Sequence, residues 1–120
     1  MNDKSSASNI LERLEAAEQL KLIGEYEQAL GILEQLLVED PENISALEEV
    51  ADNELSLEHF SRAEAAAEQA ITFDPQSYTG HYILGFLRSQ EEEWEKSLVH
   101  LQEANKLKPN NAEILRCLGW

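Results

Sequence analysis

Apolar residues recur every three or four positions along most of the chain, with polar residues between them. This spacing is typical of amphipathic helices rather than strands. Each long segment is interrupted once near its middle, for example at Gly24, so the helices are expected in pairs. The expected helices cover residues 10–22, 25–38, 44–55, 58–72, 78–88 and 92–107, with a last one from Ala112. The pattern therefore predicts an all-α fold of about seven helices.

The pattern repeats along the chain. The three prolines, Pro41, Pro75 and Pro109, are 34 residues apart, and such regular spacing indicates repeated structural units. Each proline follows an expected second helix, where its fixed φ and missing N–H end the helix. The predicted organisation is a polar N-terminal leader, 1–9, and a single domain, 10–120. The domain contains the repeats 10–43, 44–77 and 78–111 and the start of a fourth, 112–120.

Other positions share this period. The residue before each first helix has a side chain that can accept a hydrogen bond from a free N–H group of the helix start. These residues are Asn9, Asn43, Ser77 and Asn111. Further along each repeat, an aromatic residue is followed three positions later by a small one, a pairing that lets two helices approach closely. The aromatic residues are Tyr26, Phe60 and Trp94, and the small ones are Ala29, Ala63 and Ser97.

The repeated unit resembles the tetratricopeptide repeat (TPR), whose pattern is W-x2-L-G-x2-Y…A-x3-F…P. The third copy matches it with Leu84, Gly85, Trp94, Leu101, Ala104 and Pro109. The chain departs from the pattern at the first Trp position, which is held by Arg13, Leu47 and His81. The resemblance covers Ile10 to Trp120. It implies a right-handed α-solenoid of antiparallel helix pairs whose first helices line a concave groove for a peptide or a partner's helix.

The resemblance also implies which side chains face this groove. The expected partner-binding residues are Leu14, Glu18, Glu48, Asp52, Tyr82 and Phe86. Acidic residues lie at one end and aromatic residues at the other, so a partner with a basic residue and an apolar anchor would suit the surface. The alternative is an ordinary solvated face of an acidic protein, with the aromatic residues partly structural.

One known TPR ligand is not expected here. Some TPR domains use Lys, Asn and Arg to grip the C-terminal carboxylate of a heat-shock chaperone. The corresponding positions in this chain hold Leu14, Glu18, Glu49, Thr79 and Ile83. Because none of them is cationic and two are glutamates, an acidic ligand would be repelled.

Composition limits the classes of partner and the cellular locations that are expected. The chain has 120 residues, with 24 acidic and 9 basic ones and a formal net charge of -15, which disfavours nucleic acids and anionic membrane surfaces as partners. Cys117 is the only cysteine, so neither an intrachain disulfide nor a cysteine-based zinc site is expected. No segment has the length of a membrane span and the N-terminus lacks a signal-peptide pattern. These features predict a cytoplasmic protein.

The sequence contains no recognisable catalytic or phosphate-binding motif. The histidines are His59, His81 and His100, and none lies three or four residues from another histidine or from Cys117. A metal site needs three or four ligands that converge, so we expect no metal and no cofactor. The sequence therefore favours a non-enzymatic module that binds another protein.

Two alternatives stay open. The chain could be the N-terminal targeting or regulatory arm of a longer protein, possibly an enzyme, because the fourth repeat is cut off after its first helix. It could instead self-associate, with the unpaired last helix docking on another copy. The apolar residues expected to mediate such an oligomer are Leu115, Leu118 and Trp120.

Overall fold

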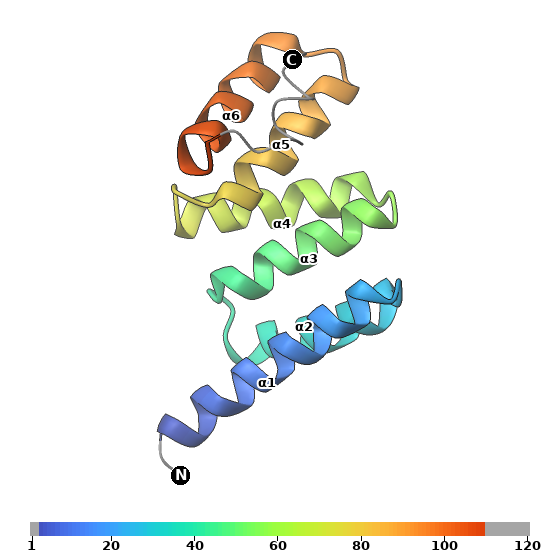
Figure 1. Cartoon of the computed structure of the whole chain (residues 1–120), viewed down its shortest axis with the longest axis vertical. Helices are drawn as coiled ribbons and strands as arrows, with labels where there is room; N and C mark the ends of the chain where they lie inside the picture. Colours follow the sequence, from blue (N-terminus) through green and yellow to red (C-terminus); the bar gives the residue numbers. More distant parts are fainter. Residues whose placement is uncertain (1–2, 110–120) are drawn as a thin grey trace.

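The computed structural model describes residues 3–109 of the chain and contains six helices in this range. They are α1 (Asp3–Leu22), α2 (Tyr26–Glu39), α3 (Ile44–Ser56), α4 (Phe60–Phe73), α5 (Tyr78–Gln90) and α6 (Trp94–Leu107). Consecutive helices form three antiparallel pairs that stack in chain order, with α1–α2 and α5–α6 at opposite ends (Figure 1). Residues 3–109 include no strand, and the all-α helix-pair architecture is confirmed. The expected helix from Ala112, with Leu115, Leu118 and Trp120, lies outside the described residues.

The first helix begins earlier than expected. α1 starts at Asp3 rather than at Ile10, because no glycine or proline interrupts the intervening residues. Asn9 therefore lies inside α1 and does not cap it, so that prediction was wrong. The two other caps within the described residues are confirmed: the Asn43 Oδ1 atom accepts a hydrogen bond from the Ala46 N–H (2.9 Å), and the Ser77 Oγ atom accepts one from the Gly80 N–H (3.0 Å).

The turn inside each repeat has the same backbone geometry. Equivalent residues in the three repeats have a positive φ, namely Gly24 (82°), Glu58 (62°) and Glu92 (61°). This left-handed conformation cannot continue a right-handed helix, and it costs a residue with a Cβ roughly 1–2 kcal/mol. The second helices α4 and α6 therefore begin at Phe60 and Trp94, two residues later than the sequence pattern indicated.

Small side chains lie where the helices approach most closely. The predicted small residues Ala29, Ala63 and Ser97 are all buried. Gly85 lies so near α6 that an added Cβ would be 2.7 Å from the Leu101 Cδ2 atom. Packing at this density leaves little room for larger residues, so these positions fix the spacing of the helix pairs. Within residues 3–109, none of the helices has both the length and the apolar character needed to cross a membrane.

Candidate functional site

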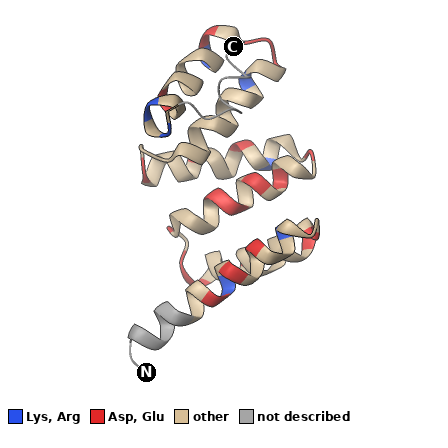
Figure 2. Ribbon diagram, viewed as in Figure 1, with Lys and Arg blue, Asp and Glu red and all other residues tan. Residues whose placement is uncertain are grey.

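The first helices α1 and α3 enclose a groove of about 330 Å³, which we call the acidic groove. Its lining consists of Leu11, Leu14 and Ser45 together with four glutamates, Glu15, Glu18, Glu48 and Glu49. Three of the predicted partner-binding residues, Leu14, Glu18 and Glu48, therefore lie together. Figure 2 shows the acidic residues along α1 and α3.

A single lysine balances part of this negative charge. The Lys21 Nζ atom donates hydrogen bonds to the Glu49 Oε1 atom (3.2 Å) and to the Asp52 Oδ2 atom (3.0 Å). Burial opposes the charge on Lys21, but the contacts with Asp52 and Glu49 outweigh it, so the pKa of Lys21 lies above its ordinary value. The predicted residue Asp52 is thus beside the groove and already paired with a cation.

The other glutamates of the groove differ in their contacts. The Glu48 Oε2 atom accepts a hydrogen bond from the Ser77 hydroxyl (2.6 Å), and this same serine caps α5. Glu48 therefore also stabilises the start of the third repeat. In contrast, Glu15 and Glu18 form no hydrogen bond or ion pair with any of the described residues. Their carboxylates are the part of the groove that is free to meet a cation.

The predicted aromatic residues lie on α5 and do not line the acidic groove. Phe86 is half-buried against a core cluster that includes Ala51, Ala63 and Leu84. Tyr82 packs against the same cluster, and its ring stacks on that of Tyr78 at 6.2 Å between centroids and 3° between planes. The structure therefore divides the predicted site into an open acidic part on α1 and α3 and a packed aromatic part on α5.

Sequence analysis missed a pair of histidines between α5 and α6. The Nδ1 atoms of His81 and His100 are 3.2 Å apart, and the His81 Nε2 atom lies 2.9 Å from the Pro75 carbonyl oxygen. Burial lowers the pKa of His100, and the neighbouring His81 and Arg88 lower it further. The signal was present in the sequence, because the two antiparallel helices of one repeat bring residues this far apart together. No three or more His, Cys, Asp or Glu side chains among the described residues are grouped as a metal site requires.

Neither a family model nor a curated protein matches this sequence. Its structure matches the first TPR domain of human RPAP3 with a TM-score of 0.80 and 20% identity, over 89% of this chain and 84% of that one. The first TPR domain of Spaghetti (RPAP3), bound to the HSP90 peptide SRMEEVD, matches with a TM-score of 0.80 and 20% identity, over 89% and 85%. The O-GlcNAc transferase of Thermobaculum terrenum matches with a TM-score of 0.85 and 20% identity, over 98% of this chain and 23% of that one. The expected TPR architecture is confirmed.

Proposed function

We propose that this chain, which has the TPR fold, is a non-enzymatic module that binds a segment of another protein in its acidic groove. The observation that carries the proposal is the pairing of exposed apolar surface with unpaired charge. Leu11 is 60% exposed and Leu14 half-buried, and the carboxylates of Glu15 and Glu18 lie in the same groove. An apolar anchor would contribute most of the affinity, and a lysine or arginine would fix the orientation.

The fold comparison supports peptide binding in general, whereas the charge of this groove indicates a different class of peptide. The peptide in the Spaghetti complex, SRMEEVD, contains three acidic residues. In this chain the positions of the carboxylate clamp that lie in the groove hold Leu14, Glu18 and Glu49. Like charges that face each other across an interface disfavour binding, so we propose a basic partner.

Isothermal titration calorimetry with matched peptides tests this proposal. One peptide is SRMEEVD, and the other carries lysine in place of its three acidic residues and an amidated C-terminus. We expect the basic peptide to bind and the acidic one not to bind. The double substitution Glu15→Gln with Glu18→Gln should weaken binding by roughly three- to tenfold, since each exposed ion pair contributes up to ~1 kcal/mol.

The control is Glu27→Gln with Glu34→Gln, which removes two exposed glutamates of α2 that lie outside the groove. It changes the net charge of the chain by the same amount as the groove variant. Absence of binding by the basic peptide would contradict the proposal. An equal loss of affinity in the control would also contradict it, because the attraction would then come from net charge alone.

A second candidate is that the chain serves as the N-terminal targeting or regulatory arm of a longer, possibly enzymatic protein. The match to the O-GlcNAc transferase favours this candidate, since the chain covers only 23% of that protein. Sequencing of the natural gene tests it. A stop codon directly after the codon for Trp120 would exclude it.

A further inference from the structure

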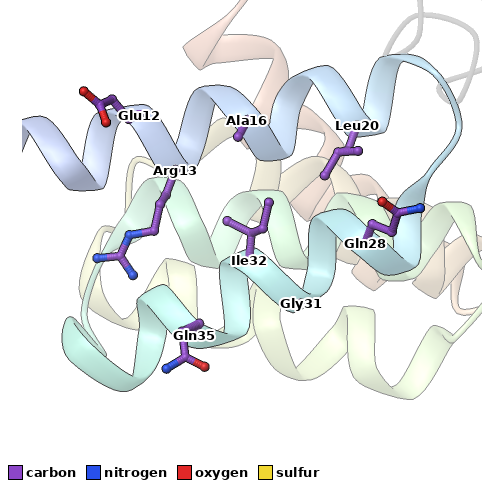
Figure 3. Close-up of a pocket in the computed structure, with 8 residues that line it drawn as sticks. All are labelled: Glu12, Arg13, Ala16, Leu20, Gln28, Gly31, Ile32 and Gln35. Carbon is purple, nitrogen blue, oxygen red and sulfur yellow. The ribbon is translucent and has the colours of Figure 1, made fainter.

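A larger groove, of about 630 Å³, lies between α1 and α2. Its apolar floor is formed by Ala16, Leu20 and Ile32, and Figure 3 shows Leu20 and Ile32 pointing toward each other from the two helices. Gly31 adds a stretch of bare α2 backbone, with Gln28 and Gln35 one turn to either side of it. We call this the α1–α2 groove.

Gly31 has no structural explanation within the described residues. Glycine in the middle of a helix is unfavourable compared with alanine, so a helical glycine usually permits a close approach. Two other helical glycines follow this rule: a Cβ added at Gly80 would lie 2.7 Å from the Ile71 Cγ1 atom, and one at Gly85 would lie 2.7 Å from the Leu101 Cδ2 atom. A Cβ added at Gly31 would meet no described atom within 4 Å other than the adjoining backbone of its own helix. The approach that Gly31 permits would therefore come from another molecule.

The second and third repeats show which helix covers the equivalent face of their first helices. Glu12 lines the α1–α2 groove, and its equivalents in the second and third repeats are Ala46 and Gly80. Ala46 is fully buried in a cluster with α2 residues, and Gly80 lies against Ile71 of α4. In both of these repeats the preceding second helix covers the face. In the first repeat no described helix does so.

We propose that a second copy of this chain covers the α1–α2 groove, with the two α2 helices crossing at Gly31. In a chain with a net charge of -15, contact between copies requires a face without concentrated like charge. Among the residues that the structure describes, only two charged ones line this groove, Glu12 and Arg13. Arg13 is already paired with Glu39 of its own chain, so the face presents one carboxylate, Glu12, rather than a concentration of like charge.

The polar rim fits the same arrangement. Each amide of Gln28 and Gln35 can both donate and accept a hydrogen bond, so a two-fold axis at Gly31 lets the amides of one copy pair with those of the other. Arg13 is held by Glu39, with bonds of 2.6 and 3.0 Å between their side chains, and so leaves the floor open. The acidic groove, with its four glutamates, would instead repel a second copy of itself.

Sedimentation velocity of the whole chain, from micromolar to millimolar concentration, tests the proposal. We expect a reversible dimer that added salt strengthens, because the exposed glutamates Glu27 and Glu34 also lie on α2 and repel across the contact. Gly31→Gln places a side chain where the helices would cross and should weaken the dimer by about 100-fold, since well-packed contacts tolerate extra volume poorly. The control is Ala65→Gln at the equivalent exposed position of α4, which should leave the dimer unchanged.

Circular dichroism and thermal unfolding verify that each variant is folded. If Gly31→Gln fails to fold, the pair Gln28→Glu with Gln35→Glu places like charges on the same rim and should weaken the dimer in the same way. A wild-type chain that stays monomeric up to millimolar concentration would overturn the proposal. So would a dimer that persists in the folded variants of the rim, because its contact would then lie elsewhere on the chain.

Discussion

Equivalent positions of the first and third repeats form surfaces of opposite kinds. Leu14 and Glu18 of α1 line the acidic groove, where Leu14 is half-buried and Glu18 exposed, whereas their equivalents Tyr82 and Phe86 of α5 are both half-buried against a core cluster. Among the described helices, α1 packs against α2 and α3, while α5 packs against α3, α4 and α6. The additional neighbouring helix of α5 accounts for the greater burial of Phe86 compared with Glu18.

The largest expected difference is in stability. Phe86→Ala removes a half-buried ring from the cluster around Ala51 and Leu84, and we expect it to lower the free energy of unfolding by about 2–3 kcal/mol. The equivalent change in the first repeat, Glu18→Gln, removes no packing and should change it by less than about 0.5 kcal/mol. Urea denaturation followed by circular dichroism measures both values.

The same two variants can also contradict the distinction between a binding surface on α1 and a packed surface on α5. If Phe86→Ala keeps its stability and instead abolishes binding of the basic peptide, then the aromatic residue of α5 contacts the partner. The predicted binding roles of Tyr82 and Phe86 would then hold, and the site would extend beyond the acidic groove.

The second prediction concerns the contact between the two surfaces. Ser77→Ala removes both the cap of α5 and the hydrogen bond to Glu48, and we expect a loss of about 1–2 kcal/mol in the free energy of unfolding. Glu48→Gln keeps an oxygen that can accept from Ser77, so it should cost less stability while still weakening binding of the basic peptide. Thermal unfolding and calorimetry separate the two effects. Equal destabilisation by both variants would show that the charge of Glu48, rather than the cap, stabilises this contact.

The architecture was predictable from the sequence because the same residue types recur at equivalent positions in three repeats. Each of these recurring features acts within one helix end or one helix pair, so its regular spacing in the sequence identifies it. They are the prolines, the caps at Asn43 and Ser77, and the small residues Ala29 and Ala63. The start of α1 was not predictable in this way. A helix that nothing interrupts extends beyond the repeat pattern, and Asn9 became an internal residue.

The candidate site was only partly predictable. The resemblance to the TPR pattern implied which positions of the first helices face the groove, so Leu14, Glu18 and Glu48 were identified together. Burial and pairing depend on neighbours from other helices. The contacts of Lys21 with Glu49 and Asp52 arise from packing between two repeats, which a linear pattern does not encode. The same is true of the open space above Gly31, which only the positions of the surrounding atoms reveal.

The third prediction concerns the carboxylates next to the acidic groove that are paired with Lys21. Lys21 holds two carboxylates next to the groove, and it is the kind of cation that a basic partner would bring. Lys21→Met keeps the apolar length of the side chain and removes the charge, so we expect the basic peptide to bind roughly three- to fivefold more tightly. Calorimetry measures the affinity. Unchanged or weaker binding would mean that Glu49 and Asp52 do not contribute to attraction of the partner.

The smallest expected effect lies in the third repeat and depends on pH. Burial holds the pKa of His100 below its ordinary value of 6.5, with further contributions from His81 and Arg88. Above this value both the folded and the unfolded chain keep His100 neutral, so the residue adds no pH dependence. As the pH falls below 6.5 the unfolded chain binds a proton first, and the free energy of unfolding should therefore decrease.

Thermal unfolding at a series of pH values between about 7.5 and 5.5, on either side of the ordinary histidine pKa, measures this decrease. His100→Gln removes the titrating group while keeping a polar side chain beside His81, and its unfolding temperature should decline less over this range than that of the wild-type chain. Equal declines would show that the histidine pair does not couple folding to pH. The acid sensitivity of the chain would then come from carboxylates such as Glu39, whose pKa the hydrogen bond from Arg13 lowers.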